Sequence, residues 1–313
     1  MKRFAVITLA LFAMVLGGCG DKPNKSSAQA DKAETNERTF TVKGVVKGLD
    51  AADKTIKVQH EAIPGYMAAM TMPFNVKDTN EVKELQTGDT ITFRLSVTSD
   101  SSWIDQITKT GGGTPQSEAP TRPSVRQVRE VEPLKVGDAL PNYRFTNELG
   151  QAVSLSEFKG KALALTFIFT RCPIPDFCPL MSKNFAAVHQ QLTAMPNAPT
   201  NWHLLTVSFD PHFDTPDVLK SYARRYQYDP QRWSFVTGAM IDIDAITDQF
   251  NLPVYKQGES WDHKLRTAVI DAEGRVQKIF VSNQWKTEEL VDELIKAAKP
   301  KAHDTAPATS PNP

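Results

Sequence analysis

Residues 162–181 read ALALTFIFTRCPIPDFCPLM, and this stretch decides the fold of the 313-residue chain. Its opening segment, 162–169, is almost entirely apolar, which is typical of a central strand covered on both faces of a sheet. Pro179 then favours the first turn of a helix. Cys172 and Cys178 lie between the predicted strand and the predicted helix. In such sheets, binding sites form at the carboxyl ends of the strands.

The alternation of strand and helix continues and predicts an α/β domain over 135–298. We expect strands at 204–209 and 233–236, a hairpin at 267–270 and 276–281, and helices capped by Thr215 and Thr287. The strand–helix–strand order at the start predicts a parallel pair of strands joined by a right-handed crossover.

The two cysteines are predicted to be reactive. Cys178 lies at a helix N-terminus, where backbone N–H groups and the helix dipole favour a thiolate, and Arg171 adds positive charge beside Cys172. Both effects predict lowered thiol pKa values, which would assist metal binding and disulfide exchange alike. The alternative is an inert disulfide, although a stabilising disulfide more often closes a longer loop than the one between these cysteines.

A smaller module is predicted over 39–110. Runs of β-branched residues and turn signals predict strands at 39–48, 55–60, 70–74, 89–97 and 103–110. Five short strands within about 70 residues favour a small closed β-barrel.

One face of this barrel carries soft ligands. Strand alternation places Met70 and Met72 together, His60 closes the preceding strand, and Met67 lies in the connecting loop. Thioether sulfur and imidazole suit Cu(I) or Ag(I) and are poor ligands for Mg²⁺ or Ca²⁺. Plain core packing is the alternative, because Met often fills gaps in apolar cores.

The amino-terminal residues predict export. Lys2 and Arg3 precede an apolar run that is too short to span a bilayer and typical of a signal peptide, 1–18. The sequence Leu16-Gly17-Gly18-Cys19 resembles the lipobox of bacterial lipoproteins, which implies a lipid on Cys19. The alternative is an ordinary secretory signal that happens to contain a cysteine. The resemblance places the protein in the bacterial cell envelope, anchored to a membrane and facing the periplasm.

Three polar segments are predicted to lie outside the folded modules. Residues 19–38 form a disordered tether, 111–134 an interdomain linker and 299–313 a disordered tail. Positive and negative side chains number 36 each, so the net charge is zero. This balance argues against a nucleic-acid partner, because phosphate binding needs a positive surplus.

The larger module resembles the Sco/SenC family. The resemblance rests on these motifs: Gly137-Asp138, Arg171-Cys172, Asp176-Phe177-Cys178-Pro179, Val207-Ser208-Phe209-Asp210-Pro211, Asp214-Thr215-Pro216 and Asp262-His263. It implies a membrane-tethered thioredoxin-like protein that handles copper for the binuclear copper site of cytochrome c oxidase. It also implies copper ligands at Cys172, Cys178 and His263. Family members usually have three residues between the cysteines, whereas this chain has five.

The smaller module resembles the periplasmic CusF-like domains. His60-Glu61-Ala62-Ile63 and Met67-Ala68-Ala69-Met70-Thr71-Met72 carry the resemblance, which implies an OB-like five-stranded barrel that binds Cu(I). The family's ligands match His60, Met70 and Met72. The family's capping Trp is absent, and Met67 lies near its place, which suggests a third thioether.

The leading hypothesis is therefore a copper metallochaperone rather than an enzyme. The barrel would collect or buffer Cu(I), and the larger module would deliver copper to an acceptor such as a cytochrome c oxidase subunit. One alternative is a thiol–disulfide oxidoreductase in which Cys172 and Cys178 cycle to reduce acceptor cysteines. Another is metal resistance through sequestration by the barrel alone. The preferred copper oxidation state at the cysteines, the membrane that holds the lipid and the oligomeric state are left open.

Overall fold

The computed structural model describes residues 37–50, 54–112, 129–252, 254–257 and 260–299. All described residues belong to one compact unit of the chain. The predicted signal peptide, Cys19, most of the tether and linker, and nearly all of the tail lie outside the described residues.

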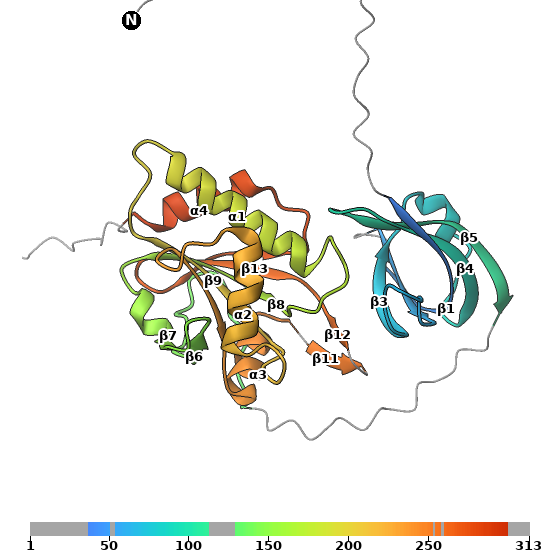
Figure 1. The fold of residues 1–313 in the computed structure, drawn as a ribbon, viewed down its shortest axis with the longest axis horizontal. Helices are drawn as coiled ribbons and strands as arrows, with labels where there is room; N and C mark the ends of the chain where they lie inside the picture. Colours follow the sequence, from blue (N-terminus) through green and yellow to red (C-terminus); the bar gives the residue numbers. More distant parts are fainter. Residues whose placement is uncertain (1–36, 51–53, 113–128, 253, 258–259, 300–313) are drawn as a thin grey trace, which may run out of the picture. The chain divides into compact units, whose positions relative to one another are not determined.

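Five antiparallel strands form the smaller sheet (Figure 1). They are β1 (Arg38–Asp50), β2 (Thr55–His60), β3 (Met70–Asn75), β4 (Asp89–Val97) and β5 (Ser102–Gly112), in the order β3-β2-β1-β4-β5. A short 3-10 helix, η1 (Thr79–Val82), connects β3 to β4. The two edge strands meet where Val76 bridges Ile104 and the Lys77 N–H donates to the Ile104 carbonyl at 3.0 Å. The sheet therefore curls on itself, as the OB-like prediction requires.

Alternating side chains fill the interior of this barrel. Val46, Ile56, Ile91, Phe93 and Ile104 are at most 1% exposed. At Gly44, β1 and β2 approach closely: a Cβ there would lie 2.5 Å from the Val58 side chain and 2.7 Å from the Gln59 carbonyl oxygen. Glycine at this position lets the two strands pair next to His60.

The larger sheet has seven strands in the order β14-β13-β8-β9-β10-β6-β7. Their bounds are β6 (Arg144–Asn147), β7 (Ala152–Ser154), β8 (Ala162–Ile168), β9 (Trp202–Ser208), β10 (Trp233–Thr237), β13 (Arg266–Ile270) and β14 (Val276–Val281). Strands β8, β9 and β10 run parallel, and the outer pairs are antiparallel. The predicted parallel pair is thus confirmed, and β8 and β9 are buried along their whole length.

Four helices pack on this sheet: α1 (Cys178–Ala194), α2 (Pro216–Ala223), α3 (Met240–Gln249) and α4 (Thr287–Ala297). Helix α1 lies beside α4 (Figure 1), and its Ser182 hydroxyl shares a 3.0 Å hydrogen bond with that of Tyr222 on α2. Two 3-10 helices, η2 (Leu155–Phe158) and η3 (Arg224–Tyr226), complete the arrangement. This mixed sheet with packed helices is the predicted thioredoxin-like fold.

The two helix caps have different outcomes. Thr215 caps α2, and its hydroxyl accepts a hydrogen bond from the Val218 N–H, as predicted. Thr287 was the wrong cap for α4. Lys286 is the N-cap instead: the helix begins at Thr287, and the Glu289 carboxylate accepts the Lys286 backbone N–H at 3.1 Å.

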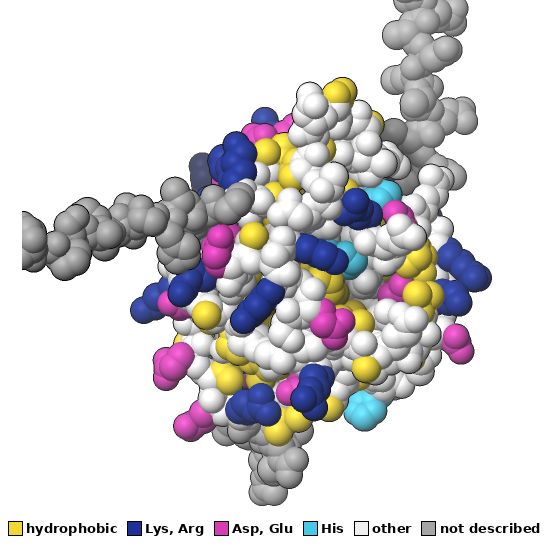
Figure 2. Space-filling view, turned by 90° about the vertical axis from the view of Figure 1, so that its left-hand side faces the viewer, with side chains coloured by type: hydrophobic (Ala, Val, Ile, Leu, Met, Phe, Trp, Pro, Cys, Tyr) yellow, Lys and Arg dark blue, Asp and Glu magenta, His cyan; other side chains and the backbone are white. Residues whose placement is uncertain are grey.

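The hairpin of β11 (Val254–Gln257) and β12 (Ser260–His263) stands apart from the seven-stranded sheet as a two-stranded ribbon. The sequence pattern did not predict it. Figure 2 shows basic and acidic side chains interspersed with apolar ones over one face of the molecule. Among the described helices, none has the length and apolar character needed to cross a membrane.

Candidate metal sites

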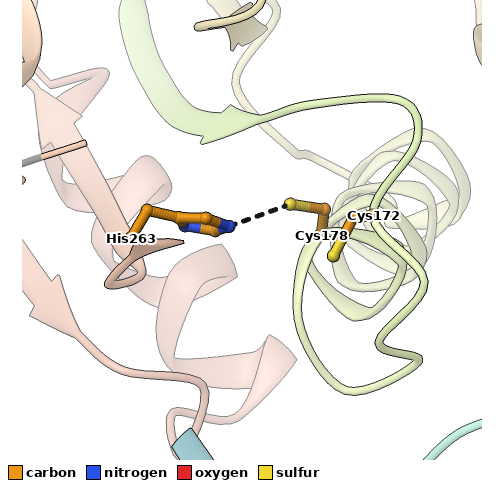
Figure 3. A group of neighbouring side chains, drawn as sticks. All are labelled: Cys172, Cys178 and His263. Atoms are coloured by element: carbon orange, nitrogen blue, oxygen red, sulfur yellow. Dashed lines mark hydrogen bonds between the residues drawn. The ribbon is translucent and has the colours of Figure 1, made fainter. Parts of the chain in front are cut away.

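Three predicted ligands converge at one end of the larger sheet. Cys172 lies in the loop after β8, Cys178 is the first residue of α1, and His263 is the last residue of β12. Their sulfur and nitrogen ligand atoms all lie within 4.8 Å of one another. Figure 3 shows the His263 ring directed at the two cysteines, with 3.8 Å between its Nε2 and the Cys178 Sγ. The chain therefore brings together residues that are 85 positions apart.

The orientation of His263 is set by a neighbouring carbonyl. Its Nδ1 lies 2.7 Å from the Lys264 carbonyl oxygen, which can only accept a hydrogen bond. Nδ1 therefore carries a proton, and Nε2, which has the lone pair in the neutral ring, faces the sulfurs. Phe169, Phe177 and Phe209 surround the ring, with centroid distances of 5.7, 6.0 and 4.8 Å respectively. The imidazole is only 6% exposed, so its position is fixed by packing as well as by hydrogen bonding.

The two thiols differ in acidity. Burial alone raises the pKa of Cys172, but hydrogen bonds from Cys178 and His263 and the positive charge of His263 lower it to about 5. Burial, reinforced by the neighbouring Cys172 thiolate, raises the pKa of Cys178 well above its usual range. The prediction that the helix N-terminus would lower the pKa of Cys178 was wrong, because the sulfur is completely buried. Both cysteines are free thiols.

The Arg171 side chain is held by an acidic and an aromatic neighbour. Its guanidinium pairs with the Asp210 carboxylate at 2.7 Å and lies 4.0 Å from the centre of the Phe213 ring. The charge that lowers the pKa of Cys172 belongs to His263. Adjacency in sequence does not determine the direction in which the arginine side chain points.

Asp214 holds the strand ends next to the site by hydrogen bonds, a role that the sequence analysis did not predict. Its buried carboxylate accepts hydrogen bonds from the Thr170 N–H at 3.0 Å and from the hydroxyls of Thr170 and Ser208. Because Thr170 follows β8 and Ser208 ends β9, one carboxylate fixes the ends of both strands. Burial raises the pKa of Asp214. The Asp-Thr-Pro motif is visible in the sequence and could have drawn attention to Asp214, but the burial of its carboxylate is not visible there.

The barrel ligands lie on paired strands. His60 of β2 is directly opposite Met70 of β3, and Met72 follows on the same face of β3. Met67 forms a bridge with Ile63 in the loop between these strands, with N–H···O distances of 2.8 and 3.0 Å. His60, Met67 and Met72 are buried, whereas Met70 is half-buried. Their roles as metal ligands stay a prediction.

His60 repeats the arrangement seen at His263. Its Nδ1 donates to the Glu61 carbonyl at 2.6 Å, so the lone pair is on Nε2. Among the described residues, this buried Nε2 has no hydrogen-bond partner, which leaves it available to a ligand. Burial lowers the pKa of His60, so the ring favours the neutral form that a metal needs. An orphaned imidazole beside thioethers fits a soft ion.

Another buried histidine belongs to neither site. His203 of β9 shares a 2.9 Å hydrogen bond between its Nε2 and the Ser234 hydroxyl and packs against the Phe158 ring. Burial lowers the pKa of His203 to about 3, so it stays neutral in the folded protein. It is a core residue at the entrance of a strand.

The comparison with known families decides the identity of the larger domain. The family model described as SCO1/SenC matches residues 132–299, more than half of the chain. The chain belongs to the SCO1/SenC family. Residues 39–109 match the family model described as copper binding periplasmic protein CusF. The predicted combination of a Sco domain with a CusF-like domain, and copper as the ion of both families, are thus confirmed.

Individual relatives resemble one part of the chain each. The SCO1 protein homolog of Bacillus subtilis is 28% identical over 155 residues, which is 48% of this chain and 73% of that protein. The cation efflux system protein CusF of Escherichia coli K12 is 27% identical over 95 residues, 30% of this chain and 84% of that protein. The crystal structure of a SCO1/SenC family lipoprotein from Bacillus anthracis is 25% identical, covers 51% of this chain and 95% of that chain, and has a TM-score of 0.47.

Proposed function

We propose that this SCO1/SenC-family protein is a copper metallochaperone with two sites. The observation that carries the proposal is the convergence of Cys172, Cys178 and His263 within 4.8 Å, with the imidazole lone pair directed at the sulfurs. Two thiols and an imidazole are a soft ligand set that suits copper. The family comparison does not favour the alternative of a thiol–disulfide oxidoreductase.

The Cys–Cys–His site combines one thiol with a lowered pKa, Cys172, and one with a raised pKa, Cys178. Cys172 would be the first sulfur to bind, because its thiolate is already favoured. Cys178 must release a proton to join, and its position inside the apolar core opposes that charge until a cation arrives. Such a site can hold copper with two or three ligands and is suited to handing it on.

The CusF-like barrel would collect or buffer Cu(I). Its set of His60, Met67, Met70 and Met72 is neutral, so binding changes the charge of the site only by that of the ion. We propose 39–110 and 135–298 as the two folded domains, and the ion would move from the first to the second.

The acceptor is proposed to be a cytochrome c oxidase subunit that carries a binuclear copper site. Membership of the SCO1/SenC family supports this choice. Incubation of the copper-loaded chain with a soluble copper domain of that subunit tests it, with copper content and visible absorption as readouts. Delivery requires stoichiometric copper gain by the acceptor, and a chain loaded only at the barrel is expected to deliver more slowly.

Attachment to a membrane is proposed through a lipid on Cys19, with both domains facing the periplasm. The periplasmic CusF match and the Bacillus anthracis lipoprotein support this location. Metabolic labelling with an alkyne fatty acid should mark the wild type and not Cys19→Ser. Label that persists in the variant, or a wild type without label, contradicts the anchor.

Copper titration tests the two-site proposal. Full-length reduced protein, titrated with Cu(I) against a competing chelator, is expected to bind two equivalents. His263→Ala should weaken only the site with thiolate absorption, whereas His212→Ala, which changes an exposed histidine, should leave both sites intact. Equal affinity in wild type and His263→Ala would remove the Cys–Cys–His site from the proposal.

A further inference from the structure

The loop between the two cysteines contacts the barrel of the same chain. The Tyr66 hydroxyl donates to the Pro173 carbonyl at 2.9 Å. Ile174, only 7% exposed, belongs to the apolar cluster of the barrel rather than to the core of its own domain. An apolar loop residue next to a metal site is thus buried by a separate domain.

Asp176 adds a polar contact on the same loop. Its carboxylate accepts hydrogen bonds from the Ser102 hydroxyl at 2.7 Å and from the Asn75 side-chain amide, both from barrel strands. Asp176 is 5% exposed, so these barrel groups replace the water that its carboxylate would otherwise bind. The loop is therefore held by an apolar anchor and by a carboxylate with two donors.

The barrel also contacts the histidine side of the site. Lys57 of β2 forms a 2.6 Å ion pair with Asp262, the residue before His263. A cavity of about 290 Å³ lies between these elements, and its lining includes Lys57, Asn75, Phe177, Asp262 and His263. The barrel therefore contacts both the cysteine loop, through Tyr66, Asn75 and Ser102, and the ribbon that carries His263, through Lys57.

Residues of both candidate sites belong to, or pack against, one apolar cluster. Met67 and Met72 belong to the barrel cluster that contains Ile174, and Met70 packs against it. Cys172 packs against this barrel cluster and against the core of its own domain. Within the described residues, Cys172 is therefore the thiol that joins the two apolar regions.

We infer that the enlarged loop between Cys172 and Cys178 is a docking element for the barrel, with Ile174 as its anchor, and that Cys172 takes Cu(I) directly from the barrel thioethers. The inference rests on the proposed copper function for its transfer step, but the docking itself does not depend on copper. Compared with the usual family spacing, the loop has two additional residues, and these lengthen it enough to place Ile174 in the barrel.

The transfer is a ligand exchange without electron transfer. Neutral thioether sulfurs leave Cu(I) as the Cys172 thiolate binds it, and the ion stays monovalent throughout. When Cys178 and His263 complete the new site, the Cys178 proton leaves to solvent. No oxidant, reductant or third component is consumed.

Photocrosslinking of the copper-free full chain tests docking. With p-benzoylphenylalanine in place of Tyr66, we expect intramolecular crosslinks to the loop peptide that contains Pro173. Ile174→Lys should reduce that crosslink at least about tenfold, because it places a charge in an apolar contact, whereas Ile174→Leu should retain it. Crosslinks elsewhere in the chain, or an unchanged yield in Ile174→Lys, would overturn the inference.

Methionine methyl NMR tests the transfer step in the same variants. With less than one Cu(I) per chain, the exchange rate between free and copper-bound barrel methyls should be independent of protein concentration in the wild type. In Ile174→Lys the exchange should slow and become proportional to concentration, because only encounters between chains would remain. Concentration-dependent exchange in the wild type would refute direct transfer.

The two tests separate this inference from the proposed function. Failure of either wild-type site to bind Cu(I) removes the proposed function, while crosslinking still reports docking. Copper binding with no loop crosslink retains the proposed function and removes docking. If Ile174→Lys fails to fold, Tyr66→Phe provides a milder variant that deletes one hydroxyl and keeps the ring. Its methionine methyl exchange rate, measured without a crosslinker, should lie between that of the wild type and that of a chain without docking.

Discussion

The two candidate sites use the same histidine device on different scaffolds. His60 and His263 each donate Nδ1–H to the carbonyl of the following residue and keep Nε2 for a ligand. In the barrel, the partners of the histidine are neutral and lie on hydrogen-bonded strands. In the larger domain they are thiols on a loop and a helix terminus. If both sites bind copper as proposed, the barrel site should depend little on pH, whereas the thiol site should depend on the position of its loop and on proton release from Cys178.

Removal of a thiol should have the largest effect on copper affinity, and only at the thiol site. Cys178→Ser is expected to weaken copper at the thiol site by more than about 100-fold, above the effect of groups that only orient a ligand. The barrel should keep its affinity, because its ligands are on separate strands. X-ray absorption of the loaded chain should show loss of short copper–sulfur distances.

Cys19→Ser is the matched control for this change, since it removes a thiol that is predicted to serve lipid attachment. In soluble protein it should bind two equivalents of copper. A loss as large as that in Cys178→Ser would mean that the thiol site has been assigned to the wrong cysteines.

The pH dependence of copper affinity should be the next largest difference between the two sites. Copper affinity at the thiol site should rise about tenfold per pH unit from about pH 6 to about pH 8, because Cys178, whose pKa is raised, must lose its proton to bind. Barrel affinity should change less over this range, because the lowered pKa of His60 favours the neutral ring and thioethers do not titrate. Chelator competition at several pH values measures both slopes, and equal slopes would contradict the assignment of ligands.

A glycine substitution should disable the barrel alone. Gly44→Ala would bring its Cβ to 2.7 Å from the Gln59 carbonyl oxygen, so β1 and β2 must separate beside His60. We expect a loss of about 3 kcal/mol in barrel stability and weaker copper at that site. Thermal unfolding and titration measure these effects. Gly48→Ala is the matched control, because its nearest neighbour lies 3.9 Å away; equal destabilisation by both would refute the close contact.

The smallest effect concerns the core of the larger domain. Folded His203 has a pKa of about 3, below its ordinary value of 6.5, so the unfolded chain takes up a proton first as pH falls. This lowers the free energy of unfolding by about 2 kcal/mol between about pH 7 and about pH 5. His203→Gln should lack that slope in urea unfolding. A variant with the wild-type slope would show that other groups cause it.

Sequence reasoning predicted the parts of the fold that periodicity encodes. The apolar run of β8, the alternation of β2 and β3 and the cap at Thr215 are local signals, and all are present in the structure. The three residues Cys172, Cys178 and His263 were grouped only through a family resemblance, because no local pattern links positions so far apart.

The sequence did not predict features that depend on the burial of a side chain or on the direction in which it points. Cys178 lies at a helix N-terminus, yet complete burial outweighs the helix dipole. Arg171 is adjacent to Cys172, yet its side chain turns toward Asp210. The role of Asp214 depends on two strand ends meeting at one carboxylate. Each of these outcomes belongs to tertiary packing, where a one-dimensional pattern carries little information.

The two-stranded ribbon that carries His263 has a consequence for copper release. Because β11 and β12 pair only with each other, their backbone hydrogen bonds are independent of the seven-stranded sheet. A displacement of His263 away from the sulfurs would therefore break aromatic packing around its ring but none of the ladder hydrogen bonds of the seven-stranded sheet.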